Sequence, residues 1–168
     1  MAEACVQQLR RYRTPILLTV ALAIAVAGVP TAISAASDGN SDAREDFANA
    51  QQFRARHDVR SARIELMNAI KADPEWIEAR VAQAEVLLKL FDGIAAEAEI
   101  DRAVILGLDP GAVRHLHGHA LYLQGKVREA RDQLMADDIP PKHQGYAARI
   151  MGKIALQMGD DQLAGLSF

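Results

Sequence analysis

The sequence predicts an all-α solenoid built from stacked helix pairs, and three observations lead to that prediction. Small residues recur at intervals of 34, at Ala50, Ala84, Gly118 and Gly152. Other apolar columns keep the same interval. Within each interval the apolar residues fall at helical spacing in two groups separated by a short polar break. Because neither helix of such a pair can bury its apolar stripe alone, the units must stack on one another.

The remaining columns indicate where the helices touch. The large column of the first helix is Phe53, Leu87, Leu121 and Ala155, the small column of the second helix is Ala62, Ala96, Ala130 and Ala164, and a second large column is Leu66, Ile100, Leu134 and Phe168. A small residue three or four positions from a large one lets two helix backbones approach while a neighbouring side chain fills the gap. We therefore expect these columns to be buried.

Capping residues predict the helix boundaries in chain order. Asp42, with Glu45 three residues later, has the pattern of a capping box that opens the first helix. Asp58 is expected to cap the second helix after a break at His57. Asp73-Pro74 and Asp109-Pro110 each pair a capping acid with a proline suited to the first helical turn, so they are expected to start the first helices of the second and third units.

The breaks within the later units follow the same logic. They fall at Phe91-Asp92-Gly93, Gly125-Lys126 and Gly159-Asp160. Gly125 and Gly159 are placed where a glycine commonly ends a helix, because glycine tolerates the left-handed conformation found there. Each unit should therefore be a helix, a tight turn and a second helix.

This pattern resembles the tetratricopeptide repeat (TPR) family, whose 34-residue unit is a helix-turn-helix with a closing proline. Pro74 and Pro110 match that proline, and Pro140-Pro141 ends the third unit. The resemblance covers about residues 43–168 and implies a right-handed superhelical solenoid with units at 43–76, 77–110 and 111–144 and a partial unit at 145–168. Because Phe168 falls in a second helix that has barely begun, we expect either the N-terminal part of a longer repeat protein or an end that meets a partner.

The N-terminal residues predict a signal segment over residues 1–36. Arg10, Arg11 and Arg13 precede an apolar run over residues 16–29, and small residues follow up to Ala36. The run is shorter than the ~20 residues that span a bilayer comfortably, which favours cleavage over a retained anchor. If it is retained, residues 16–29 would associate with the inner membrane, and the charge pattern would direct the repeats outward. Both alternatives predict a periplasmic or exported array, joined to the segment by a polar linker at 37–42.

Composition and motifs argue against several functions. The net charge is −3, and the chain after residue 36 carries 16 basic and 21 acidic residues, which disfavours a nucleic-acid partner. Cys5 is the only cysteine and lies before the first apolar run, so a disulfide or thiolate metal site is excluded from the folded part. The sequence contains no phosphate-binding glycine loop, no Gly-x-Ser-x-Gly elbow and no Cys/His nucleophile pattern. We expect no catalytic residues and no cofactor.

His115 and His119 share a helix face and could together contact a metal ion, with His117 between them in sequence. The stretch lacks the Glu of the His-Glu-x-x-His motif and has no evident third ligand. We therefore predict no metal site and interpret the pair as residues that line a groove.

The TPR resemblance implies that the first helices line a concave groove. The candidate groove residues are Phe47, Gln51, Arg54, Val81, Glu85, Leu88, Lys89, His115, His119, Tyr122, Leu123, Arg149 and Lys153. They lack the Lys and Asn pattern of members that clamp the C-terminal carboxylate of a chaperone. The sequence predicts a non-catalytic scaffold of the bacterial cell envelope that binds a peptide or partner domain there. The alternative is the regulatory or binding segment of a longer enzyme, or of an envelope or polysaccharide-export assembly protein, truncated at Phe168.

Overall fold

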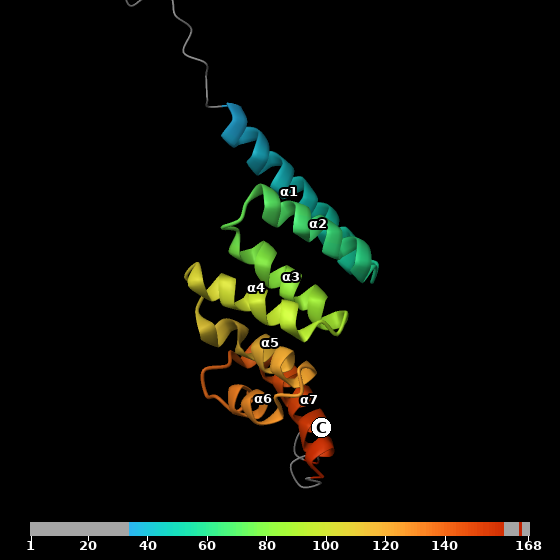
Figure 1. Ribbon diagram of the computed structural model, residues 1–168, viewed down its shortest axis with the longest axis vertical. Helices are drawn as coiled ribbons and strands as arrows, with labels where there is room; N and C mark the ends of the chain where they lie inside the picture. The colour runs from blue at the N-terminus through green and yellow to red at the C-terminus, as the bar shows by residue number, and fades with distance from the viewer. Residues whose placement is uncertain (1–33, 160–164, 166–168) are drawn as a thin grey trace, which may run out of the picture. The chain divides into compact units, whose positions relative to one another are not determined.

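The computed structural model describes residues 34–159 and Gly165 of the 168-residue chain, and within them every regular element is an α-helix. The helices are α1 (Ser34–Ala55), α2 (Val59–Ala72), α3 (Ile77–Lys89), α4 (Gly93–Ile105), α5 (Pro110–Leu123), α6 (Val127–Leu134) and α7 (Pro141–Met158) (Figure 1). None of these helices is long and apolar enough to cross a bilayer. The predicted signal or anchor lies outside the described residues for all but its last three positions, and Ala164 and Phe168 lie outside them as well.

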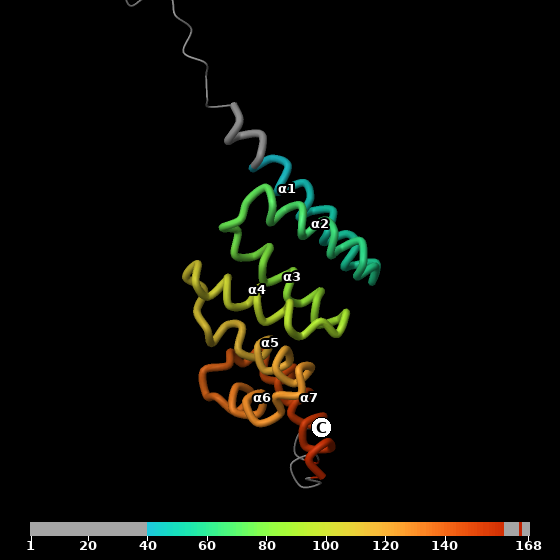
Figure 2. The backbone as a smooth tube through the Cα atoms, viewed as in Figure 1, coloured from blue at the N-terminus to red at the C-terminus, as the bar shows by residue number. Residues whose placement is uncertain are grey.

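Consecutive helices pack as pairs that stack along one direction, as the backbone trace shows (Figure 2). Three apolar clusters hold the stack together, and each draws on three successive helices. The first contains Ala50, Ala62, Leu66, Ala82 and Val86, the second contains Ala84, Leu87, Leu88, Ala96, Ile100, Val113, Leu116 and Ala120, and the third contains Leu121, Ala130, Leu134, Ile139, Ala147, Ile150, Met151 and Ile154. Each pair therefore completes its core with the first helix of the next pair, as expected of a solenoid.

The predicted columns are buried throughout the described residues, with one partial exception. Ala50, Ala84, Gly118 and Gly152 are all buried, as are the alanines and the large residues of the second helices. Phe53 is only partly buried, because it packs at the margin of the first apolar cluster. The residues that recur every 34 positions are thus those at which the helices of the folded chain pack together.

The turns inside the units repeat with the same period in backbone conformation. His57, Phe91, Gly125 and Gly159 have φ of 60°, 61°, 77° and 72°, and each ends a first helix. The carboxylate that follows caps the next helix in the first two units, because Asp58 accepts from the Ser61 amide and Asp92 accepts from the Ala95 amide, each at 3.1 Å. The predicted breaks of the first three units and the Asp58 cap are confirmed, and Gly159 caps the C-terminal end of α7.

Replacement of Phe91 by glycine is expected to raise the free energy of unfolding. A bulky residue in the left-handed region costs about 1–2 kcal/mol, and the larger unfolded-state entropy of glycine offsets about half of that gain. The Phe91 side chain is 79% exposed, so its removal sacrifices little packing. Urea denaturation should show a gain of about 0.5–1 kcal/mol. Gly125→Ala should change stability in the opposite direction, and a less stable Phe91→Gly variant would contradict this account.

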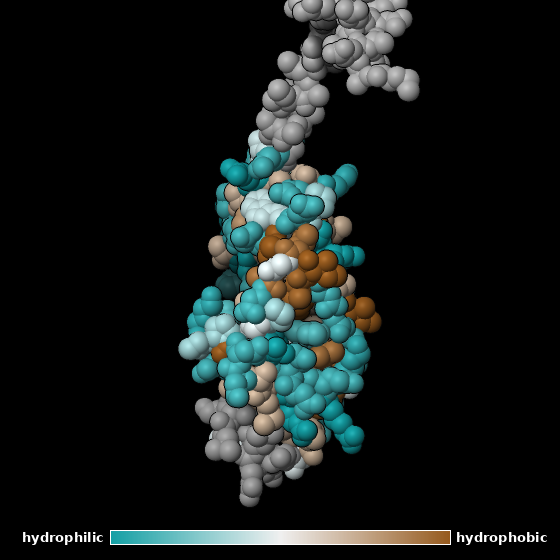
Figure 3. All heavy atoms as spheres, turned by 90° about the vertical axis from the view of Figure 1, so that its left-hand side faces the viewer, coloured by the Kyte–Doolittle hydropathy of each residue, from teal (hydrophilic) through white to brown (hydrophobic). Residues whose placement is uncertain are grey.

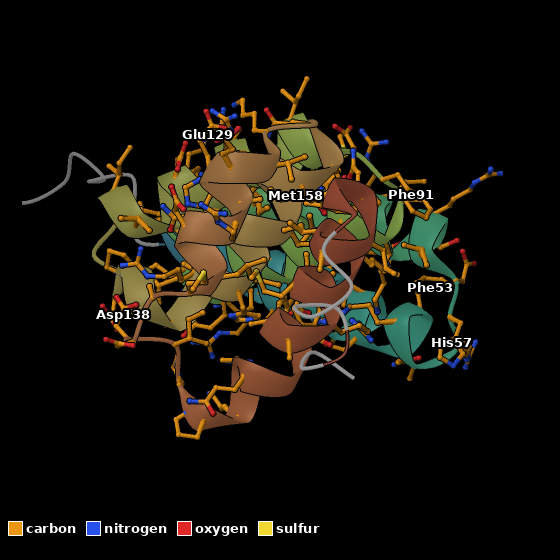
Figure 4. All side chains as sticks on the ribbon, turned by 90° about the horizontal axis from the view of Figure 1, so that it is seen from below. Phe53, His57, Phe91, Glu129, Asp138 and Met158 are labelled. Carbon is orange, nitrogen blue, oxygen red and sulfur yellow. The ribbon has the colours of Figure 1, made fainter. Side chains whose placement is uncertain are left out.

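The two edges of the stack carry different connections. The turns within units lie along one edge, where Figure 4 places His57 and Phe91 toward the same side. The connectors between units lie along the other edge in Figure 1. Figure 3 faces this second edge and shows a hydrophobic patch midway along it, among hydrophilic side chains. Ile105, at the end of α4, is 83% exposed.

The first predicted helix start is wrong. Helix α1 begins at Ser34, so residues 37–42 are helical and Asp42 lies inside the helix instead of capping it. A glycine inside a helix costs only about 1 kcal/mol, which nearby alanines can offset. The turn-like residues around Gly39 therefore did not stop the helix.

The start of α3 is also later than predicted, whereas that of α5 is confirmed. Asp73 ends α2, and its carboxylate accepts from the Glu75 amide at 3.2 Å. The turn that follows places the Trp76 ring 4.6 Å from that of Phe47, and the helix begins only at Ile77. Asp109 caps α5 with Pro110 in its first turn, as predicted. An Asp-Pro pair thus fits either a helix start or a turn, and tertiary packing decides between them.

Candidate functional site

The first helices of the units carry two adjoining pockets. The N-terminal pocket, about 380 Å³, is lined by Phe47, Gln51, Arg54, Ile77, Glu78, Val81, Ala82, Glu85, Leu108, Ala112, Val113, Lys142 and His143. The C-terminal pocket, about 320 Å³, is lined by Glu85, Leu88, Lys89, His115, Leu116, His119, His143, Tyr146 and Arg149. Because both include Glu85 and His143, they form one groove that runs past α1, α3, α5 and α7.

Ten of the thirteen candidate groove residues line these pockets. They are Phe47, Gln51, Arg54, Val81, Glu85, Leu88, Lys89, His115, His119 and Arg149. Tyr122 instead packs against the third apolar cluster, Leu123 packs against the second, and Lys153 is exposed on α7 without lining either pocket. Whether any of them contacts a ligand stays a prediction.

Two prominent lining residues, His143 and Tyr146, were not predicted. Both lie in the first two turns of α7, which begins at Pro141, within the stretch that the 34-residue register assigned to the third unit or to the edge of the fourth. Pro141 occupies the first turn of this helix, where a proline is favourable. That proline was the signal in the sequence that could have placed His143 on the groove.

The N-terminal pocket combines apolar walls with one ion pair. Ile77, Val81 and Val113 contribute apolar surface. Nη2 of Arg54 pairs with the Glu85 carboxylate, and this ion pair joins α1 to α3. Nη1 of Arg54 donates to the Gln51 side chain at 3.0 Å. The Glu85 carboxylate, placed between the two pockets, is therefore already neutralised by a cation of this chain.

The C-terminal pocket is built from stacked rings. The His115 side chain is 4% exposed, and its ring lies parallel to that of His143, with centroids 3.9 Å apart. The Tyr146 ring meets His115 edge-on at 5.3 Å. The guanidinium of Arg149 lies 4.9 Å from the centre of the Tyr146 ring, a cation–π arrangement. Helices α5 and α7 meet through these rings.

Burial sets the protonation of this cluster. It lowers the pKa of His115 to about 4, with help from the charges of His143 and Lys142. It also lowers the pKa of His119 to about 4, with help from Lys153 and Arg149. Burial raises the pKa of Tyr146 to about 12. Near neutral pH His119 and Tyr146 are therefore both neutral, and Nδ1 of His119 shares a hydrogen bond with the Tyr146 hydroxyl, 2.5 Å away.

Stability should fall as the pH decreases from about 6.5 toward 4. His115 and His119 have pKa values of about 4 in the fold against 6.5 in the unfolded chain, so the unfolded state binds more protons in this range. The stabilisation is present above pH 6.5 and is lost as the pH falls through 4. Urea denaturation should show a loss on the order of 1 kcal/mol at about pH 5 relative to pH 7. His115→Phe should reduce this loss, whereas the exposed His57→Gln should not.

The histidine stretch does not converge on one point. Nε2 of His117 lies 3.4 Å from a Glu97 oxygen on α4, whereas His115 and His119 face the groove. Among the described residues, no group of three or more His, Cys, Asp or Glu side chains is placed to hold a metal ion. The arrangement offers hydrogen bonds, rings and charges for recognition.

No protein-family model matches this chain, and no curated protein matches it. Several solved structures, in contrast, match its fold. A Pseudomonas aeruginosa PilF structure superposes with a TM-score of 0.58 at 21% identity, covering 77% of this chain. The first TPR domain of Spaghetti (RPAP3), bound to the HSP90 peptide SRMEEVD, gives 0.60 at 16% identity over 71% of this chain and 95% of that one.

The fold is that of a TPR solenoid. The TPR2B domain of yeast Sti1, in complex with an Hsp70 component, agrees with a TM-score of 0.53 at 21% identity over 76% of this chain and 96% of that one. The predicted fold class is thereby confirmed. This chain spans 60% of the length of the PilF chain.

Proposed function

We propose that this TPR solenoid is a non-catalytic interaction scaffold that binds a peptide segment of a partner protein in the groove of its first helices. The observation that carries the proposal is the continuity of the two pockets through Glu85 and His143. A continuous groove accommodates an extended segment better than a compact metabolite, which a single enclosed cavity suits. Two structures of the same fold, RPAP3 with an HSP90 peptide and the Sti1 domain in its Hsp70 complex, support a peptide ligand.

The site of action that we propose is the bacterial cell envelope. The basic, apolar and small-residue stretches of residues 1–36 support export of the repeats, either by cleavage or by retention of residues 16–29 as an inner-membrane anchor. N-terminal sequencing of the protein recovered from a periplasmic fraction tests both. A start near Ser37 would indicate cleavage, an intact start in the membrane fraction would indicate an anchor, and recovery from the cytoplasm alone would contradict export.

The binding proposal is tested by affinity capture with the full chain and a groove variant. Val81 is partly buried in the N-terminal pocket and packs at the margin of the second apolar cluster, so Val81→Arg fills the pocket and its folding is checked separately. Ile64→Arg makes the same kind of change on α2, at a side chain that is 58% exposed and lines neither pocket. Both variants are compared with the unaltered chain in an envelope extract, and the captured proteins are identified by mass spectrometry.

We expect a partner that is captured by the unaltered chain and by Ile64→Arg but lost with Val81→Arg. Circular dichroism melting of both variants checks that each remains folded. Equal capture by Val81→Arg would place the interaction outside the groove. No partner in any arm would contradict the scaffold proposal and favour the alternative, that the segment serves a longer enzyme or assembly protein.

A further inference from the structure

Cations surround the C-terminal pocket. Lys89 on α3 and Arg149 on α7 line it directly. The charges of Lys142 and Lys153 act on its histidines, so both ammonium groups lie nearby. The acidic residue of the lining is Glu85, which Arg54 already neutralises. The chain as a whole has a net charge of −3, so this pocket is locally basic on an acidic protein.

The buried part of the pocket offers unused hydrogen-bonding capacity. Nδ1 of His115 is buried and has no hydrogen-bond partner in the part of the chain that the structure describes. A buried polar atom left unpaired costs free energy, which a ligand that supplies the missing partner recovers. Nδ1 of His119 is paired with the Tyr146 hydroxyl, which leaves the other ring nitrogen, Nε2, outside this hydrogen bond.

The other half of the groove favours a different side chain. The N-terminal pocket adjoins the C-terminal one at Glu85 and His143, and Val81, Leu108 and Val113 provide apolar walls there. A segment lying along the groove therefore meets cations and rings in one pocket, and in the next it meets apolar surface beside the charged side chains of Arg54, Glu78 and Lys142. Complementary charge fixes the orientation and register of a ligand more than it raises affinity.

We propose that the groove selects a partner segment carrying an acidic side chain for the C-terminal pocket and an apolar side chain for the N-terminal pocket. This inference rests on the proposed function and specifies its ligand. The acidic group is a side-chain carboxylate held by Lys89 and Arg149, with the lysines of α7 adding to the local potential. The apolar side chain lies against Val81 and Val113.

The test is selection from a library of random peptides, each about twelve residues long and flanked at both ends by fixed sequence so that no terminus is free. The immobilised target is the full chain. Selected sequences are then synthesised with acetylated and amidated ends, and their affinities are measured by fluorescence anisotropy. We expect enrichment of Asp or Glu near an apolar residue. Lys89→Glu and Arg149→Glu should each weaken binding at least about fivefold, because each replaces an attractive charge in the pocket by one that repels the ligand carboxylate.

Arg128→Glu on α6 is the matched control, because Arg128 is exposed and lines neither pocket. It should change affinity less than about twofold, the size of a screened surface effect. Enriched peptides without acidic residues would overturn the inference and leave the scaffold proposal standing. The same holds if the Arg149→Glu variant binds the peptides with the same affinity as the Arg128→Glu variant. Ligands found only when the peptide has a free C-terminus would also overturn it. No enrichment, or peptides insensitive to Val81→Arg, would overturn both.

Discussion

The Gly93→Ala variant is expected to lose about 2–3 kcal/mol in the free energy of unfolding, the upper part of the range for overpacking. A Cβ atom on Gly93 would lie 2.6 Å from the Ala120 carbonyl oxygen and 2.9 Å from Cβ of Leu123. One atom belongs to the backbone of α5 and the other is the first side-chain atom of Leu123, so a change of rotamer moves neither of them. Helix α4 would have to move away from α5 and open the second apolar cluster.

Gly145→Ala is the matched control for this prediction. Gly145 is exposed within α7, and a Cβ added there has no neighbour within 4 Å. The same substitution should therefore stabilise the fold by about 0.5–1 kcal/mol through helix propensity. Urea denaturation of both variants measures the difference. A Gly93→Ala variant as stable as the unaltered chain would show that α4 and α5 do not approach as closely as described.

Burial at the helix contacts could be predicted because it depends on local periodicity. Ala96 and Ile100 are one helical turn apart, and the equivalent residues 34 positions along the chain are buried as well. The columns therefore identify the core without knowledge of the fold. Gly93 was predicted only as part of a turn. Its burial depends on α5, whose Ala120 lies 27 residues later, and no pattern in the local sequence reports that approach.

The groove could be predicted only as far as the repeat register holds. His115 and His119 line the C-terminal pocket because their unit follows the register. His143 and Tyr146 were missed because α7 begins early, at Pro141, and adds turns that the register did not assign to the groove. Leu123 was assigned to the groove, but it packs against α4 at the end of α5, where the helix face has rotated away from the groove. Helix ends, where repeats differ most, limit the prediction.

Loss of the Glu99 side chain is expected to cost about 3 kcal/mol of stability, the magnitude seen when one member of a buried ion pair is removed. Glu99 on α4 accepts from Nη1 of Arg80 on α3 at 2.8 Å, with side chains only 15% and 10% exposed. Nε of Arg80 also donates to the Pro74 carbonyl at 2.9 Å, which fixes the turn before α3. In Glu99→Ala the guanidinium stays buried without its counter-charge, because that backbone bond and the close packing hold it in place.

A double variant that removes both charges separates this effect from simple loss of packing. Arg80→Met combined with Glu99→Leu removes both charges and keeps apolar volume, so it should be clearly more stable than Glu99→Ala alone, since a buried pair replaced by apolar residues is often near neutral. Asp138→Asn, which weakens a more exposed contact with Arg114, should have a smaller effect. If the double variant were as unstable as Glu99→Ala, loss of the Arg80–Pro74 contact, which only the double variant suffers, would cost as much as the unpaired charge. Arg80 would then stabilise the turn before α3 as much as the α3–α4 interface.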